Sequence, residues 1–450
     1  MSKVEFGALF LEPLRNGVTK PKRVRGSGYK MVNMGEIFSL SFIQNQTMDR
    51  VPLTDKEKAA TLLQNNDLLF ARQSLVRDGA GKCSIFLNDN EPVCFESHII
   101  RVRLNQELCY PMFYYYFFSS RLGKNTMDKI IEQGAGAAGI RGSDLAKLEV
   151  PYIEYSKQKE IADSLYSFDQ KIQLNTQINQ TLEQIAQALF KSWFVDFDPV
   201  RAKVQALSDG LSLEQAELAA MQAISGKTAE EMTALSQAQP DRYAELAETA
   251  KAFPCEMVEV DGVEVPKGWE RKALDEVANY QNGLALQKFR PENNEPFLPV
   301  VKIAQLRQGY ADGDEKAKAN IKPECIINNG DVVFSWSGSL LVDIWCGGKA
   351  ALNQHLFKVS SKEYPKWFYY FYTKHHLTEF QRIAYDKAVT MGHIKREHLS
   401  AAKCIVPNDE LLANKTLENI LEKIIFNRLE NFNLQDTRDL LLPRLLSGEI

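Results

Sequence analysis

The chain has 450 residues, enough for two or three domains, and 44% of them are hydrophobic, so sizeable cores can form. The formal net charge of −4 argues against a free-standing, high-affinity nucleic-acid binder, and no apolar run is long enough to cross a membrane. Seven scattered cysteines without a CxxC pair argue against a zinc ribbon or a disulfide framework and predict reduced thiols in the cytoplasm.

The charge is unevenly distributed along the chain. Residues 200–262 carry eleven acidic and five basic side chains, whereas residues 1–155 carry twenty basic and seventeen acidic ones. The acidic segment therefore masks a mildly basic N-terminal region. Its Ala-, Glu- and Gln-rich composition predicts short surface helices, which are either a solvated decoration or a partner surface.

In the first third, short β-rich runs alternate with turn signals. Strands are predicted at 67–70, 94–102 and 147–151. The aromatic run at 110–120 has a proline at its second position, which is well tolerated in a first helical turn. Adjacent aromatics on a helix point all around it, which favours a short buried helix; base stacking is the alternative function for these rings.

The same motifs recur in the same order later in the chain. Asn16-Gly17-Val18 resembles Asn282-Gly283-Leu284, and a histidine precedes a β-rich run in both places, at His98 and His355. The remaining matches are NNDLLF at 65–70 with NNGDVVF at 328–334, YPMFYYYF at 110–117 with YPKWFYYF at 364–371, and GI at 139–140 with GHI at 392–394. Ordered matches over about 150 residues indicate a duplication. The second set predicts strands at 331–334, 354–359 and 403–407.

Each half ends in a long amphipathic segment, predicted as helices at 156–194 and 409–446. Apolar residues alternate at spacings of three and four, as in a coiled coil, and both stripes carry two asparagines at equivalent central positions. An antiparallel pair matches apolar with apolar and amide with amide; packing of each helix on its own domain is the alternative. The predicted interface consists of Leu165, Ile172, Asn175, Asn179, Leu182, Ile424, Asn427, Asn431, Leu434 and Leu441.

The predicted fold class is therefore mixed α/β with pseudo-two-fold symmetry. Two similar domains, 1–155 and 263–408, are each followed by a long helix, 156–194 and 409–450, and residues 195–262 form an acidic helical insert. A helix of some 35 residues is roughly 50 Å long. Two different domains held at a fixed separation suit a linear, two-part target such as duplex DNA.

Several segments resemble the specificity subunit of type I restriction–modification enzymes. They are DLLFAR at 67–72, Gly-Lys at 81–82, the GI…L…VP pattern at 139–151, the helix KIQLNTQINQTLEQIAQALFKSWFVDFDPV at 171–200, VPKGWE at 265–270, MGHI at 391–394 and RDLLLPRLLSGEI at 438–450. The 171–200 and 438–450 segments are the specific ones. One departure is the N-terminus, where VEFGALF lacks a counterpart of Gly268-Trp269.

The resemblance implies two target-recognition domains that each read half of a split site in double-stranded DNA, with the helices setting the spacer. It implies two modification (methyltransferase) subunits as partners and allows for restriction subunits. S-adenosylmethionine, ATP and Mg are expected on those partners, with no cofactor, metal site, catalytic residue or membrane contact in this chain.

Polar loops that follow the matched strands are the candidate DNA contacts, because base edges and phosphates need donors and acceptors within reach. Solvated loop side chains are the plain alternative for each single residue. The candidates are Arg72, Gln73, Ser74, Arg77, Lys82, Arg141 and Ser143 in the first half, and Lys302, Gln305, Arg307, Ser335, Trp336, Ser337, His393 and Lys395 in the second. Since the two sets differ in type, an asymmetric target is expected.

Two further features of the sequence allow other interpretations. Gly134 to Gly139 form a GxGxxG pattern without the strand–turn–helix context of a dinucleotide site, and we expect a flexible loop there. A two-domain protein–protein adapter that binds no DNA is the alternative function, since the net acidity and the pseudo-symmetry both permit it.

Overall fold

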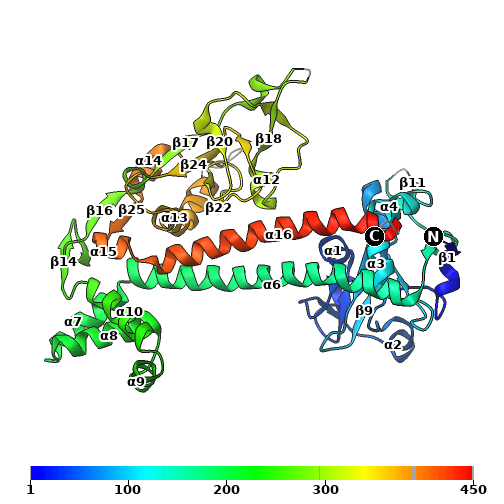
Figure 1. The fold of residues 1–450 in the computed structure, drawn as a ribbon, viewed down its shortest axis with the longest axis horizontal. Coiled ribbons are helices and arrows are strands. Elements are labelled where there is room, and N and C mark those ends of the chain that lie inside the picture. Colours follow the sequence, from blue (N-terminus) through cyan, green and yellow to red (C-terminus); the bar gives the residue numbers. More distant parts are fainter. Residues whose placement is uncertain (1, 135, 293, 387–391, 448–450) are drawn as a thin grey trace. The chain divides into compact units, whose positions relative to one another are not determined.

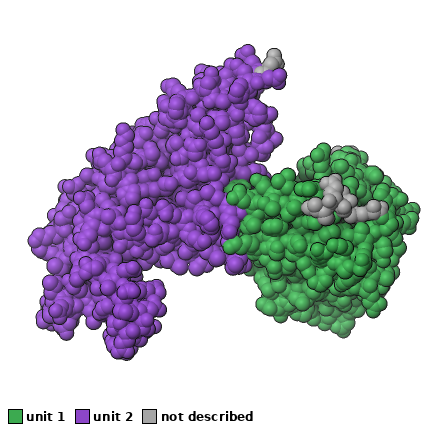
Figure 2. Space-filling view, viewed as in Figure 1, with its two compact units in different colours: residues 1–173, 431–450 green, residues 174–430 purple. Residues whose placement is uncertain are grey.

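The computed structural model describes residues 2–134, 136–292, 294–386 and 392–447. The chain divides into two compact units (Figure 2): unit 1 comprises residues 1–173 and 431–450, and unit 2 comprises residues 174–430. Met391 of the MGHI motif, Ala135, and the last three residues of the terminal motif lie outside the described residues.

Unit 1 is built on a five-stranded sheet with the order β2-β10-β6-β8-β4. All residues of its central strands are buried and most are apolar, apart from Ser84 and Arg101, and Phe70 of β6 lies opposite Ile100 of β10. A run that is buried on both faces needs no polar alternation. The strands are β2 (Arg15–Asn16), β4 (Phe42–Ile43), β6 (Leu68–Ala71), β8 (Cys83–Phe86) and β10 (Ile99–Val102).

Three smaller sheets complete unit 1, with the orders β5-β3-β9, β11-β12-β7 and β1-β13. The strands are β1 (Ser2–Glu5), β3 (Tyr29–Val32), β5 (Asp49–Val51), β7 (Gln73–Ser74), β9 (Val93–Phe95), β11 (Glu132–Gln133), β12 (Ala138–Gly139) and β13 (Glu149–Tyr152). Despite the missing Gly-Trp pair, the N-terminal strand β1 pairs antiparallel with β13.

The aromatic run of unit 1 forms α3 (Pro111–Ser119), in which eight consecutive residues are buried, as expected. Phe70 and Phe118 meet edge to face at 5.1 Å between ring centroids, so α3 packs directly on the central sheet. The other helices of this region are α1 (Met34–Ser39), α2 (Asp55–Thr61), α4 (Arg121–Asp128) and α5 (Gly142–Ala146).

Unit 2 repeats this plan. Its sheets have the orders β17-β24-β21-β22, β19-β18-β23-β20, β16-β25 and β14-β15. The strands are β14 (Met257–Val260), β15 (Val263–Pro266), β16 (Glu270–Ala273), β17 (Asn279–Asn282), β18 (Phe297–Val301), β19 (Lys316–Lys318), β20 (Ile326–Ile327), β21 (Val332–Ser335), β22 (Val342–Ile344), β23 (Ala350–Leu352), β24 (Leu356–Ser360) and β25 (Lys403–Val406). The helices are α11 (Leu274–Val277), α12 (Ile303–Gln308), α13 (Lys366–Asp386) and α14 (Arg396–Ala401).

The equivalence between the units extends to single hydrogen bonds. The Asp67 carboxylate accepts from the Gln64 amide at 2.8 Å before β6, and the Asp331 carboxylate accepts from the Asn328 amide at 2.8 Å before β21. Both aspartates also hold a cation from the neighbouring strand region, Arg103 at 2.7 Å and Lys358 at 2.8 Å. The repeat seen in the sequence is therefore a repeat in structure.

Two predicted elements are divided in the structure. The strand predicted at 94–102 is two strands, β9 and β10, because the chain turns at 96–98. The second long helix, predicted from 409 without a break, is a short α15 (Asp409–Leu412) followed by α16 (Lys415–Ser447). Asn414 ends one helix and starts the next, since its Oδ1 accepts from the Thr416 amide at 2.9 Å.

Side-chain hydrogen bonds join the first long helix, α6 (Tyr155–Phe194), to α16 within each unit. Both helices are labelled in Figure 1. In unit 2, Asn427 Nδ2 donates to Asn179 Oδ1 at 2.9 Å and Asn175 Nδ2 donates to Glu430 at 2.7 Å. In unit 1, Arg438 forms an ion pair with Asp169. Residues later in α6 contact residues earlier in α16, as in the pairs Asn179–Asn427 and Asn175–Glu430, so the two helices run antiparallel.

The acidic insert consists of four helices that pack on one another: α7 (Asp198–Ser208), α8 (Leu213–Ser225), α9 (Ala229–Ala238) and α10 (Pro240–Ala252). Lys203 of α7 is buried and its Nζ donates to the Phe253 carbonyl at 2.7 Å, which closes the insert at its end. The rings of Trp193 and Phe253 meet at 5.4 Å, and those of Phe194 and Trp269 at 5.9 Å. The insert, which is part of unit 2, thus has its own core and an aromatic junction with the rest of that unit.

Candidate nucleic-acid interface

The polar loop after β6 enters a small edge sheet in unit 1. The chain leaves the buried sheet at Ala71, and β7 pairs with β12, which in turn pairs with β11. The Ile140 amide donates to the Arg72 carbonyl at 3.0 Å, which extends the pairing beyond β12. The loop expected around Gly134 to Gly139 is therefore partly strand, because Gly139 pairs with Gln73.

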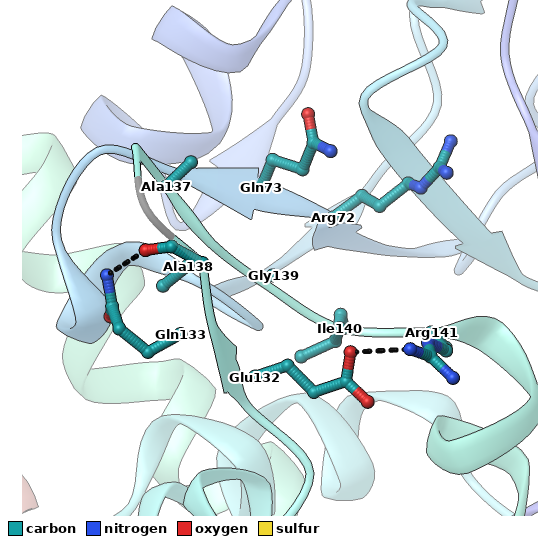
Figure 3. Close-up of a pocket in the computed structure, with 10 residues that line it drawn as sticks. Arg72, Gln73, Glu132, Gln133, Ala137, Ala138, Gly139, Ile140 and Arg141 are labelled. Carbon is teal, nitrogen blue, oxygen red and sulfur yellow. Dashed lines mark hydrogen bonds and ion pairs between the residues drawn. The ribbon is translucent and has the colours of Figure 1, made fainter.

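A hollow of about 330 Å³ lies on this edge (Figure 3). It brings together three predicted contacts, Arg72, Gln73 and Arg141. The lining residues are Arg72, Gln73, Glu132, Gln133, Gly134, Ala137, Ala138, Gly139, Ile140 and Arg141. Arg141 pairs with Glu132 at 2.8 Å, and both side chains are largely exposed.

Arg72 and Gln73 make no side-chain hydrogen bond or ion pair with any residue that the structure describes. The hollow therefore offers uncommitted donors from Arg72 and Gln73 and acceptors from Gln73 and Glu132. This mixture matches the donor and acceptor pattern of base edges better than a purely basic surface would.

The loop beyond β7 is held in place by its polar side chains. Ser74 Oγ accepts from the Val76 amide at 3.2 Å. Arg77 Nε donates to Asp128 at 2.9 Å, and its guanidinium also reaches the carbonyl of Ile131. Ser74 and Arg77, predicted as DNA contacts, thus shape the loop, and they leave Leu75 87% exposed at its tip.

Lys82 and Ser143, also predicted as contacts, lie away from the hollow's lining. Lys82 Nζ donates to the Phe38 carbonyl at 2.6 Å at the end of α1. Burial and the nearby Lys124 ammonium lower the pKa of Lys82. Ser143 is exposed on α5, where its Oγ is 3.5 Å from Asp144.

The equivalent edge of unit 2 has a different chemistry. Ser335 and Ser337 are buried, which differs from the expectation that they face DNA: Ser335 Oγ donates to the Ser337 carbonyl at 3.1 Å, and Ser337 Oγ lies 2.9 Å from His355 Nδ1. Trp336 occupies the position of Arg72, since its carbonyl accepts from the Ile394 amide at 3.0 Å. Its indole packs on His355 at 5.8 Å between ring centroids.

His393 and Lys395 are brought to this edge. His393 is exposed, and its backbone forms an isolated antiparallel β-bridge with Ser337. Its imidazole meets the Trp336 ring edge to face at 6.3 Å between ring centroids. Lys395 is exposed and lies 3.5 Å from Glu397. The unit 2 edge therefore presents an indole, an imidazole and an ammonium group, whereas unit 1 presents the guanidinium groups of Arg72 and Arg141 and the amide of Gln73.

The predicted contacts of α12 are mostly engaged within the protein. Lys302 forms an ion pair with Glu315, and Gln305 Nε2 donates to Asp312 at 2.8 Å. Arg307 is exposed and has no side-chain partner among the described residues.

Two acidic residues of α6 that the sequence analysis missed anchor the aromatic helices. Tyr116 of α3 donates to Asp169 at 2.6 Å in unit 1, and Lys374 of α13 forms an ion pair with Glu183 in unit 2. Burial would raise the pKa of the Glu183 carboxyl, but Lys374 outweighs it and holds the pKa below its ordinary value. The sequence signal that could have identified them is the recurrence of an acidic residue, Asp169 and then Glu183, beside the apolar and amide positions of α6.

The predicted helix-pair residues have mixed environments. Leu165, Asn175, Ile424 and Asn427 are buried, whereas Ile172, Asn179, Leu182, Asn431, Leu434 and Leu441 are partly exposed. At the end of α16 it is Leu442, not Leu441, that belongs to the unit 1 core. There α16 packs on the domain core, in the same cluster of buried residues as Leu165 of α6.

Among the residues described, no cluster of three or more His, Cys, Asp or Glu side chains could hold a metal ion. None of the helices in the described part of the chain has the length and apolarity needed to span a membrane.

Comparison with known proteins places both halves in one family. The model of the type I restriction modification DNA specificity domain matches residues 15–184 and again residues 266–437. The HindI specificity subunit of Haemophilus influenzae is 37% identical over 434 residues, covering 93% of this chain and 94% of that protein. The MjaIX specificity subunit of Methanocaldococcus jannaschii is 25% identical over 350 residues, covering 75% and 68%.

A crystal structure of a type I restriction–modification S subunit from M. genitalium has a related fold. It matches with a TM-score of 0.50 at 14% identity, covering 99% of this chain and 95% of that one.

Proposed function

Because this chain belongs to the type I restriction–modification DNA specificity family, we propose that it reads an asymmetric DNA sequence in two parts, one with each unit. The chain is a DNA-recognition subunit and has no catalytic role of its own. The comparisons give no support to the alternative of an adapter that binds no DNA.

One observation carries the proposal of two unequal half-sites. The Arg72 carbonyl and the Trp336 carbonyl accept equivalent backbone hydrogen bonds at 3.0 Å, yet the side chains at these positions differ completely. The backbone of the two edges is equivalent, but their different side chains present different hydrogen-bond donors and acceptors to the bases. Two copies of one half-site, related by symmetry, would not fit such a pair of edges.

The proposed base contacts are the accessible side chains of each edge. In unit 1 these are Arg72, Gln73 and Arg141; in unit 2 they are Trp336, His393 and Lys395. The exposed Arg307 of α12 is a further proposed contact. Lys302 and Gln305 can contact DNA only if Lys302 breaks its ion pair with Glu315 and Gln305 breaks its hydrogen bond with Asp312. The buried Ser335 and Ser337 set the shape of the edge and are left out of the contact set.

The chemistry is proposed to reside on partner subunits. Two modification subunits would bring S-adenosylmethionine, and restriction subunits, where present, would bring ATP and Mg, all in the cytoplasm. Apolar side chains exposed on the long helices favour docking there: Leu174 is 50% exposed, Ile185 44% and Phe426 57%. The proposed functional segments are two target-recognition domains (1–155 and 263–408), two spacer helices (156–194 and 409–450) and the acidic insert (195–262).

The test is the methylation pattern of DNA from cells that produce the chain together with its methyltransferase. We expect one bipartite motif whose two halves differ in sequence. A palindromic motif would contradict unequal edges, and an unmethylated genome in the presence of assembled complex would contradict DNA reading altogether.

A further inference from the structure

Each unit carries a short basic turn soon after its Asn-Gly turn. In unit 1 it is a 3₁₀ turn, Lys22–Val24, with Lys22 and Arg23; in unit 2 it is Leu286–Phe289, with Lys288 and then Arg290. All four basic side chains are exposed. None of them makes a side-chain hydrogen bond or ion pair with a residue that the structure describes.

Neighbouring cations, by contrast, are already neutralised. Lys20 lies 2.8 Å from Glu57, and Arg25 lies 2.6 Å from Asp49. In unit 2 the two acids that follow the turn, Glu292 and Glu295, both face Lys318, at 3.8 and 3.2 Å. In unit 1 the neighbouring carboxylates are already paired, so both positive charges of the turn are in excess. In unit 2 the two carboxylates share one ammonium, so the two basic side chains of the turn still leave a positive charge in excess.

The turns are attached to equivalent places in the two units. The Val18 amide donates to the Phe95 carbonyl and the Leu284 amide donates to the Leu352 carbonyl, both at 2.9 Å. The glycines that precede them cannot carry a side chain, since a Cβ on Gly17 or Gly283 would lie 1.9 or 2.3 Å from those same carbonyl oxygens. Close backbone packing thus fixes where each basic turn begins.

The same strand connections also hold the proposed reading edges. In unit 1, residues 96–98 contact both features. The Ser97 backbone N–H donates to the Val18 carbonyl after the Asn-Gly turn at 3.0 Å, and the Arg72 backbone N–H at the reading edge donates to the His98 carbonyl at 2.8 Å. In unit 2, Gln354 N donates to Leu284 O at 2.9 Å and Trp336 N to His355 O at 3.4 Å. Lys22 follows Val18 by four residues, at most ~14 Å of extended chain.

We propose that the two basic turns bind the phosphate backbone of the duplex whose bases the adjacent edges read. The assignment rests on the proposed function. Phosphate contacts position a protein without carrying sequence information, so they should be alike in the two units, whereas base contacts should differ. The turns are alike in charge and attachment, and the edges are not.

The test compares two double variants, Lys22→Ala/Arg23→Ala and Lys288→Ala/Arg290→Ala. The full chain with its methyltransferase subunits is titrated onto a duplex carrying its methylation motif and onto a scrambled duplex, between about 50 and 200 mM salt. Each phosphate contact contributes roughly 0.9 to the slope of log affinity against log salt. We expect each double variant to reduce that slope by nearly two, with equal losses on both duplexes and an unchanged motif.

A matched control removes the same charge elsewhere. Lys157 and Lys159 are exposed on α6 and already pair with Glu160 and Asp163, so Lys157→Ala/Lys159→Ala should leave the slope unchanged. The proposal is overturned if the turn variants keep the wild-type slope, if they lose affinity only for the motif duplex, or if they lose the methyltransferase instead. A wild-type complex without preference for the motif would refute the proposed function, and a reduced slope on both duplexes would still support the turns.

Discussion

The edges of unit 1 and unit 2 have equivalent backbone hydrogen bonds but expose different side chains. In unit 1 the edge opens into a hollow with Arg72 and Gln73 unengaged. In unit 2 the serines turn inward, and Trp336 packs between His355 and His393. The frame is held by main-chain hydrogen bonds and by glycine at close approaches, so it places few demands on the edge side chains. Specificity can therefore vary while the fold stays the same.

The largest effect is expected from breaking the shared frame. Gly17→Ala and Gly283→Ala each force a Cβ against a backbone carbonyl, at 1.9 and 2.3 Å, and backbone cannot move aside cheaply. We expect about 2–3 kcal/mol of destabilisation in both units, measured by urea unfolding. Gly35→Ala is the control, because a Cβ there has nothing within 4 Å. Equal unfolding midpoints for Gly17→Ala and wild type would show that the backbone accommodates a Cβ at this position and would contradict the prediction.

A second test separates the two edges. Arg72→Ala should relax the motif only in the half read by unit 1, and Lys395→Ala only in the half read by unit 2. A lost base contact costs about 1–3 kcal/mol of discrimination. The readout is the affinity for duplexes in which one half-site at a time is scrambled. If either variant relaxed both halves equally, the units would not read independently.

The smallest expected effect is a pH dependence confined to unit 2. Burial and the neighbouring His375 lower the pKa of His376 to about 4 from an ordinary 6.5. As pH falls, the unfolded state takes up this proton first, so stability is lost between about pH 6.5 and pH 4. Partial exposure limits the loss to about 1–2 kcal/mol, against 1.36 kcal/mol per pKa unit for a fully realised shift.

All five tryptophans of the chain belong to unit 2, so intrinsic tryptophan fluorescence follows its unfolding. Denaturant midpoints at pH 7 and pH 5 should differ more for the wild type than for His376→Gln, which keeps the contribution of His375, whose pKa burial also lowers. A difference of the same size in His376→Gln would assign the whole effect to other groups.

The sequence predicted those features that depend on repeated patterns. The duplication, the buried aromatic helices and the two long helices follow from ordered motifs and from periodicity. The break at Asn414 was missed because a capping asparagine is compatible with a helix pattern on either side of it.

The candidate site was less predictable because strand patterns do not give orientation once both faces are buried. Ser335 continues the buried run Val332-Val333-Phe334, and in such a strand a serine can lie inside as readily as outside. Arg77 and Lys82 are basic loop residues by sequence, but their carbonyl and carboxylate partners come from distant segments. The basic turns were missed because the sequence does not show that the nearby acids are already paired with other cations.

The antiparallel pairing of α6 with α16 has a consequence for the order of synthesis. Helix α6 ends at Phe194, and its partner begins at Lys415, roughly 220 residues later. At about 5–20 residues per second, the ribosome needs some 10–45 s to deliver that partner. During this interval α6 lacks its partner helix, and its seam carries Asn175 and Asn179 among apolar residues. We expect these two amides to lower the tendency of the unpaired apolar seam to associate with other chains during synthesis.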